Sequence, residues 1–308
     1  MLFRSANGNA YTGGFTINDG TLAVGGVNAM GAGGTLTING GIIRGNSASA
    51  RDLTGKYTSI TIGGDFTLGS TNSASNGALT FNHTTAAVPV TLGASNRTIT
   101  VHSDVTIGAF TVISGNAGIG ITKDGSGILI LAGTNTFTGA LVIKNGTVNG
   151  QNNTNSLGTT GGVTLGGTGS TGATLTGGKD FSGNVNITVN PPDSGSCTIS
   201  ANGTGSGMAV GSVTLNSANV TVETFASGTS AATTVRGGVT GTGNLTLNNL
   251  NNGASATGAP KLTTVTVNHT GAITNQGNGT TATLISAVIG TNVTRVVQNS
   301  STASLELQ

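Results

Sequence analysis

Short runs in which apolar residues alternate with Thr, Ser or Asn recur along the whole chain. Clear examples are TSITIGGDFTLG (58–69), RTITVHSDVTIG (97–108), GSVTLNSANVTVE (211–223), GTGNLTLNN (241–249) and TTVTVN (263–268). A period of two places successive side chains on opposite faces of a strand. Each run therefore predicts short β-strands with one face in a core and the other in water.

Residues 118–150 show most clearly how these strands are joined. The predicted strands there are Ile128–Leu131, Leu141–Ile143 and one beginning at Thr147–Val148. The predicted corners between them are 123–125 (Lys-Asp-Gly), 133–135 (Gly-Thr-Asn) and 145–146 (Asn-Gly). Gly, Asn and Asp tolerate the backbone conformations of tight turns, so this segment is expected to be a chain of strands and sharp corners.

The pattern is also repeated as a unit. Residues 9–40 align with residues 135–167, because both copies place Asn, an aromatic residue, Gly and Ile at matching positions. The matched pairs include Asn9 with Asn135, Tyr11 with Phe137, Gly13 with Gly139 and Ile17 with Ile143. Internal repeats of this length are the sequence signature of a solenoid.

A strand of about five residues cannot bury its inner face alone, whereas coils stacked about 4.8 Å apart pair their backbones and pile up their apolar side chains. We therefore predict an all-β fold, a right-handed parallel β-helix (β-solenoid) spanning residues 1–308. At roughly 20–25 residues per coil the chain would make about 12–15 coils. Asn residues near the corners are expected to stack into hydrogen-bonded ladders.

The succession GSGILIL, GTNTFTGALVI and NGTV within residues 118–150 resembles the passenger-associated repeat of bacterial autotransporters, also called the autotransporter-associated β-strand repeat. Family members show Gly-x-Gly-x-Leu-x-Leu, Asn-Thr-Tyr-Thr-Gly-Gly and a final Gly-Thr-Leu. Here Phe137 replaces the Tyr and Ala140 the second Gly, while the copy at 9–40 keeps both. The resemblance implies a passenger β-helix displayed outside a Gram-negative cell, with no catalytic residues of its own.

Composition narrows the possible functions. Only 6% of the 308 residues are charged, against about 25% in an ordinary domain, while 54 are Gly. The net charge of +2 comes from scattered Lys and Arg, which argues against nucleic-acid binding. A single Cys excludes an internal disulfide, and no apolar run predicts a membrane-spanning helix. The start has no signal-peptide core, so if the protein is exported, its export signal is expected to lie upstream or to be unconventional.

Candidate chemical groups are sparse. Asp19, Asp65 and Asp124 each stand beside Gly at a predicted corner, where Asp stabilises the turn. His102 and Asp104 are two apart and could share one face of a strand, but nothing nearby completes a site. His83 and His269 follow Asn after a strand and are interpreted as turn residues. Cys197 lacks a His partner, and GTGSTG (167–172) precedes no helix, so we predict no catalytic, metal or cofactor site.

The two ends interrupt the repeat at nearly the same phase, since Leu305 and Leu307 resemble the Leu-x-Leu that precedes the Asn-Thr-Tyr-Thr motif. Either the chain is cut from a longer array, or copies stack end to end.

Taken together, these patterns favour a non-enzymatic extracellular β-solenoid of a bacterial surface protein, acting as a passenger stalk, adhesin or structural fibre element. The expected partners are glycans or other cell surfaces, and no translocator barrel is expected in this stretch. Two alternatives stay open: a filament subunit that self-associates end to end, and a polysaccharide-active β-helix enzyme. The enzyme would need two or three carboxylates within reach of one another in a surface groove.

Overall fold

A computed structural model describes residues 12–26, 29–31, 33–84, 87–109, 111–151, 153–159, 161–181, 183, 185–201, 207–224, 231–252 and 258–308. The described regular structure is β-strand apart from one 3₁₀ turn at Ser73–Ser75, so the all-β prediction is confirmed. No helix in these ranges is long and apolar enough to cross a membrane. Contacts divide the chain into unit 1 (residues 1–142 and 146–161) and unit 2 (143–145 and 162–308).

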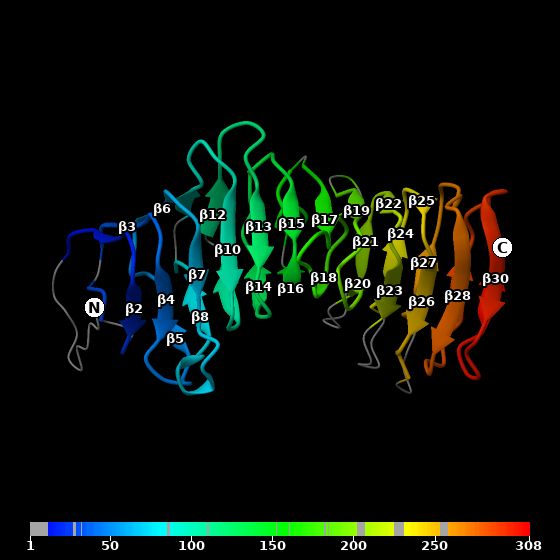
Figure 1. Ribbon diagram of the computed structural model, residues 1–308, viewed down its shortest axis with the longest axis horizontal. Helices are drawn as coiled ribbons and strands as arrows, with labels where there is room; N and C mark the ends of the chain where they lie inside the picture. The colour runs from blue at the N-terminus through cyan, green and yellow to red at the C-terminus, as the bar shows by residue number, and fades with distance from the viewer. Residues whose placement is uncertain are drawn as a thin grey trace. The chain divides into compact units, whose positions relative to one another are not determined.

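Unit 1 winds through three parallel sheets. Face A contains β1 (Phe15–Ile17), β3 (Thr35–Ile38), β6 (Ser59–Ile62), β9 (Val88–Thr91) and β12 (Thr111–Ser114). Face B contains β2 (Thr21–Val24), β4 (Ile42–Gly45), β7 (Phe66–Leu68), β10 (Arg97–Val101) and β13 (Ile121–Asp124). Face C contains β5 (Arg51–Asp52), β8 (Leu79–Phe81), β11 (Val105–Ile107), β14 (Ile128–Leu131) and β16 (Asn145–Gly150). From β3 to β14 the chain visits faces A, B and C in that order, so each face gains one strand per turn (Figure 1).

Unit 2 is built in the same way, from three sets of parallel strands. Face D contains β17 (Val163–Leu165), β19 (Ile187–Val189), β22 (Val213–Asn216) and β25 (Val239–Thr242). Face E contains β18 (Gly172–Gly177), β20 (Cys197–Ala201), β23 (Val220–Thr224), β26 (Leu245–Asn249), β28 (Gly271–Gly277) and β30 (Val293–Gln298). Face F contains β21 (Met208–Val210), β24 (Thr233–Val235), β27 (Lys261–Leu262), β29 (Thr283–Ile285) and β31 (Leu305–Leu307). The remaining strand, β15 (Leu141–Ile143), carries the division between the units.

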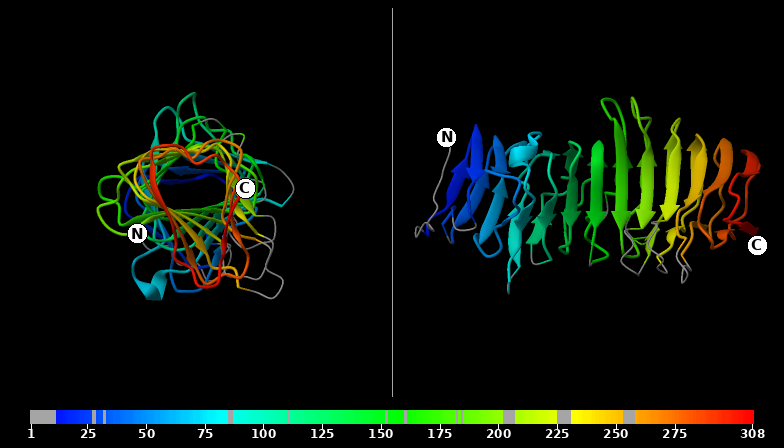
Figure 2. Two further views of the ribbon diagram at one scale, coloured as in Figure 1. Left: turned by 90° about the vertical axis from the view of Figure 1, so that its right-hand side faces the viewer. Right: turned by 90° about the horizontal axis from the view of Figure 1, so that it is seen from below.

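The strands of each unit lie side by side as successive rungs of a β-solenoid (Figure 2). The described strands make about 11 turns, fewer than the 12–15 predicted. The difference comes from long corners: Leu36 and Ile60 on neighbouring rungs are separated by 24 positions (36 to 60), but Phe66 and Ile99 by 33 (66 to 99). Loops that leave the rung lengthen a turn without adding a strand.

Inward side chains form continuous columns inside each unit. On face B, the register stacks Leu22 on Ile43, Ile43 on Leu68 and Leu68 on Val101, and all four are at most 4% exposed. On face E of unit 2, Cys197, Val220, Leu245 and Ile273 stack in the same way and are equally buried. Fully burying an aliphatic side chain contributes roughly 1.5–3 kcal/mol, so these columns supply the main stabilisation.

One predicted strand is absent. Residues 263–268 alternate in sequence, yet they form a corner after β27, with only an isolated bridge at Val267. The Val265 N–H donates to the Thr263 carbonyl at 2.9 Å, and Thr264 has a φ of 74°. This hydrogen bond closes a γ-turn with positive central φ, a strained conformation that leaves Val265 48% exposed. Alternation alone does not distinguish such a corner from a strand.

Asn side chains do connect neighbouring turns, as predicted. Asn39 donates to the Asn18 side chain at 2.8 Å, and Asn216 donates to the Asn190 side chain at 2.9 Å. More often an Asn oxygen accepts a backbone N–H of the next turn, as between Asn96 and Gly120 at 2.9 Å. The ladder therefore contains Asn–Asn hydrogen bonds and Asn–backbone hydrogen bonds, because backbone N–H groups at the corners also need acceptors.

Leu129 tests the stacked core. It is fully buried on β14, between Val105 and Val148 in the register of face C. We expect Leu129→Ala to lower the free energy of unfolding by about 2–5 kcal/mol, because it leaves a cavity inside the column. Urea unfolding followed by circular dichroism measures this loss. Ile130→Ala is the control, since Ile130 points outward, and an equal loss in the control would contradict the assignment.

Candidate functional site

Two of the predicted corner aspartates stabilise their own turns. The Gly20 N–H donates to Asp19 Oδ1 at 2.6 Å, and the Gly125 N–H donates to Asp124 Oδ1 at 2.7 Å. Both glycines have positive φ, which the tight turn requires. The turn role predicted for Asp19 and Asp124 is confirmed.

Asp65 instead ties two turns together. Its Oδ1 accepts the backbone N–H of Thr98, on the next rung of face B, at 2.7 Å. Asp65 therefore connects two successive turns. The sequence did not predict this contact, because the pattern of one strand does not show which residues of the next rung lie beside it.

The register also places Asp65 and Asp19 along one hollow on the surface. Both carboxylates line a hollow of about 530 Å³ on the outer surface of face B. The rest of the lining is Gly20, Thr21, Gly41, Ile42, Phe66, Thr67, Thr98 and Thr100. Thr21 pairs with Ile42 and Ile42 with Thr67, so Asp19 and Asp65, each two residues upstream, lie two rungs apart. We call this feature the face B hollow.

The spacing of the two carboxylates does not suit glycoside hydrolysis. Two rungs of about 4.8 Å separate the backbones of Asp19 and Asp65 by about 10 Å, and the Asp65 carboxylate reaches further away, to Thr98 on the next rung. Retaining enzymes hold their carboxyl groups about 5 Å apart and inverting enzymes about 6.5–9.5 Å. Both side chains are also exposed, so neither occupies the desolvated pocket that a general acid needs. The face B hollow offers surface for binding but no paired acid and base.

His102 and Asp104 do not share a strand. They lie in the corner between β10, which ends at Val101, and β11, which begins at Val105. No hydrogen bond or ion pair joins their side chains in the described part of the chain. His102 and Asp104 therefore do not form a general base with a carboxylate that orients it.

Cys197 is a core residue. It is fully buried on face E, and burial raises the pKa of its thiol to about 11. Its Sγ lies 3.8 Å from the Asn190 carbonyl oxygen. A protonated thiol inside the core is a poor nucleophile, so Cys197 serves as a core side chain.

His269 was predicted as a turn residue, but it is fully buried. Its Nε2 lies 3.4 Å from the Ala272 carbonyl oxygen, and its Nδ1 has no partner among the described residues. Burial lowers the pKa of the imidazole, so it stays neutral at pH 7. The ring fills the inside of a corner that the sequence suggested would be open to water.

Lys123 is a buried cation that the sequence analysis placed in a corner. It lies instead on β13, on the same inward side as Ile121, and is fully buried. Its Nζ donates to the carbonyls of Gly125 and Gly127, both at 2.5 Å, and so holds the corner between β13 and β14. Burial lowers the pKa of the amine to about 8, against the opposing effect of the Asp124 carboxylate.

Asn135 performs a similar role one corner later. It is fully buried; its Oδ1 accepts the Ile113 N–H at 2.8 Å, and its Nδ2 donates to the Ser156 carbonyl at 2.6 Å. One side chain thereby joins the turn before it to the turn after it. Phe137 is also fully buried, and a Cβ at Gly139 would lie 2.3 Å from the Ile119 carbonyl carbon. The Asn-Thr-Phe-Thr-Gly motif is therefore a stacking element.

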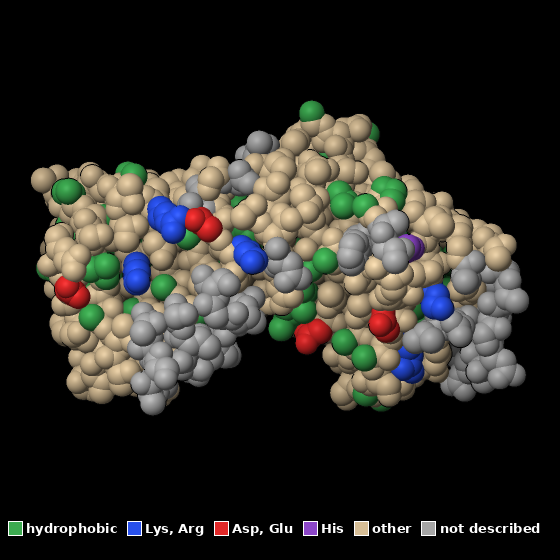
Figure 3. Space-filling model, turned by 180° about the vertical axis from the view of Figure 1, so that it is seen from behind, with side chains coloured by type: hydrophobic (Ala, Val, Ile, Leu, Met, Phe, Trp, Pro, Cys, Tyr) green, Lys and Arg blue, Asp and Glu red, His purple; other side chains and the backbone are tan. Residues whose placement is uncertain are grey.

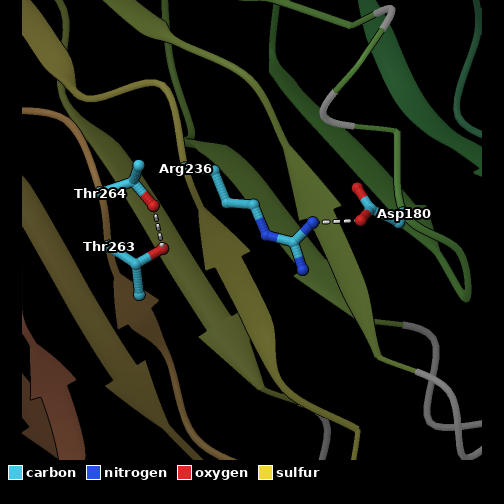
Figure 4. A network of polar contacts seen from close by, with 4 residues as sticks. All are labelled: Asp180, Arg236, Thr263 and Thr264. Carbon is cyan, nitrogen blue, oxygen red and sulfur yellow. Dashed lines mark hydrogen bonds and ion pairs between the residues drawn. The ribbon is translucent and has the colours of Figure 1, made fainter.

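In unit 2, Arg236 and Asp180 form an ion pair on the surface (Figure 4). Their side chains are 47% and 48% exposed, so the pair contributes at most about 1 kcal/mol. On the corner of the following rung the hydroxyls of Thr263 and Thr264 lie 3.4 Å apart. The ion pair connects two corners, whereas the contact between Thr263 and Thr264 lies within one corner.

Few charged side chains lie on the surface shown in Figure 3, and most of them are separated by uncharged ones. Within the described ranges, no three His, Cys, Asp or Glu side chains gather closely enough to hold a metal ion.

Comparison with known proteins agrees with the role of the stacking motif. Residues 3–24 and 121–149 match the family model of the passenger-associated-transport-repeat, which confirms the resemblance found in the sequence. The second match contains Lys123, Asn135 and Gly139, whereas residues 3–11 of the first, including Asn9 and Tyr11, lie outside the described residues. Neither a curated protein nor a solved structure matched the chain. The repeat and the β-solenoid fit an autotransporter passenger domain.

Lys123 makes a prediction about pH. Because its folded pKa is lowered to about 8 from 10.5, the unfolded chain binds more protons between these values. Cys197, whose folded pKa is raised to about 11, would lower the free energy of unfolding over the same range, so the test uses a Cys197→Ala background. There the free energy of unfolding should rise between about pH 8 and 10, on the order of 2 kcal/mol. Urea unfolding across this range measures the rise.

In Lys123→Met the slope should disappear. Lys56→Met, which removes a partly exposed lysine, is the control and should keep it. A slope that survives in Lys123→Met would contradict the assignment.

Proposed function

We propose that this chain is a non-enzymatic stalk in an exported bacterial passenger, and that its function is to fold into a stack of rungs outside the cell and hold adhesive surfaces there. The observation that carries the proposal is the matched repeat at 121–149, whose polar residues connect successive turns. An exported chain needs a fold that can be built without a preformed core, and a solenoid meets this need because each rung contacts only its neighbours.

The contacts of Asn135 support folding in steps. Its two hydrogen bonds, to Ile113 and to Ser156, join consecutive turns, so each is made only when the neighbouring turn is in place. A rung that emerges from the cell can dock on the exposed edge of the previous rung. The free energy released at each step opposes backward movement of the chain and contributes to export.

The outer surface supports the adhesive part of the proposal. Outward positions on the strands are rich in Thr, as at Thr67 on face B and Thr221 on face E. Hydroxyl groups repeated at the rung spacing suit weak contacts that gain strength through multivalency. Glycans and other cell surfaces are the partners that such a surface would contact.

Export tests the proposal directly. The natural protein that contains this chain would be compared with a variant lacking residues 118–150 and with Leu129→Ala, by protease digestion of intact cells. We expect surface display to fall strongly for the deletion and partly for Leu129→Ala, because both weaken the stacking of successive rungs. Ile130→Ala and total protein abundance are the controls. Normal display of the deletion variant would refute the role in export.

A further inference from the structure

The face B hollow in unit 1 exists because glycine interrupts a row of side chains. At the corner between faces A and B, one position just ahead of β2, β4 and β7 stacks from rung to rung. The residues at that position are Asp19, Gly40 and Asp65. A Cβ at Gly40 would lie 2.6 Å from the Asn18 carbonyl oxygen, and one at Gly41 would lie 2.6 Å from the Gly20 carbonyl oxygen. Close packing of the rungs therefore keeps the middle of the row empty, with a carboxylate on each side.

The two carboxylates are held in place by the backbone. Asp19 Oδ1 accepts the Gly20 N–H at 2.6 Å, and Asp65 Oδ1 accepts the Thr98 N–H at 2.7 Å. Within the described chain no protein group bonds to the second oxygen of either carboxylate. Each is thus an oriented acceptor at the hollow, available to a donor from outside. Charge-assisted hydrogen bonds to such acceptors are stronger than neutral ones.

The rest of the lining is polar at its edges and apolar at its floor. Outward Thr21, Thr67 and Thr100 can donate and accept hydrogen bonds, while Ile42 offers a half-buried apolar surface between them. Among the described residues no Lys or Arg lines the hollow, so an anion there would meet two carboxylates and no lining cation. A single metal ion cannot bridge these carboxylates, whose backbones lie about 10 Å apart with Asp65 reaching away toward Thr98, since cation–oxygen distances are about 2.3–2.6 Å.

We propose that the face B hollow binds a hydroxyl-rich oligosaccharide without acidic groups. Sugar hydroxyls would donate to Asp19 and Asp65 at the two ends, and the C–H face of a ring would lie over Ile42 and the backbone of Gly41. This assignment deepens the proposed adhesive function by placing one contact at named residues. It is tested on the purified chain, so a failed export experiment would leave its result unaffected.

The test is calorimetric or NMR titration of the purified chain with three oligosaccharides of equal length: neutral glucose-based, glucosamine-based with free amines, and galacturonic-acid-based. We expect weak binding of the neutral and amine-bearing sugars and none of the acidic one. Asp19→Asn and Asp65→Asn keep the acceptor for the backbone N–H but lose the charge, so each should weaken binding about 5-fold. Thr67→Trp should abolish binding by filling the hollow.

Two matched controls separate the site from general surface effects. Asp52→Asn changes an exposed aspartate that also stabilises its own turn, through Thr54, but lies outside the hollow. Thr61→Trp adds an indole to the outward side of β6 on face A. Both should bind like the unchanged protein. The proposal would be overturned if neither non-acidic sugar bound, or if the acidic sugar bound as tightly as they do. It would also be overturned if Thr67→Trp left binding unchanged, or if Asp52→Asn weakened binding as much as Asp19→Asn and Asp65→Asn do.

Discussion

The fold depends on one constraint: equivalent residues of successive turns must stay in register, so that inward aliphatic side chains stack while the backbones pair. A strand of three to five residues buries too little surface to be stable alone. In register, Leu22, Ile43, Leu68 and Val101 stack on one another over four successive rungs and become almost completely buried. A slip by one residue would turn the whole column to the solvent, so burial itself enforces the register.

Polar residues reinforce this register where the strands end. Backbone groups at a corner leave the sheet and need partners, and buried ones are costly without them. Asn135 and Lys123 meet this need from inside the solenoid, since both are fully buried and both bond to backbone groups of nearby corners or turns. The matched repeat therefore encodes its hydrogen bonds as well as its apolar side chains. A desolvated amine at Lys123 costs stability at neutral pH, which its two carbonyl partners offset.

Local patterns were sufficient for much of the fold. Ile128–Leu131 and Leu141–Ile143 were predicted with their observed bounds, because alternation and glycine corners define them. The strand predicted at 263–268 was wrong, because the positive φ of Thr264 arises from the corner geometry and not from local propensity. The number of turns was overestimated since loop length varies between rungs. The presence of Asp19 and Asp65 in one hollow could not be predicted, because it depends on a register that spans 46 positions (19 to 65).

Disulfide trapping in a Cys197→Ala background measures the register most directly. Thr106 and Ile130 are outward partners on β11 and β14 of face C, with Cα atoms about 5 Å apart across neighbouring rungs. The pair Thr106→Cys and Ile130→Cys should oxidise readily to an internal disulfide, because this separation lies within the range that a disulfide spans. The pair Thr106→Cys and Ile128→Cys, displaced by two residues along the strand, should not. Equal cross-linking of both pairs, or of neither, would contradict the stacked register.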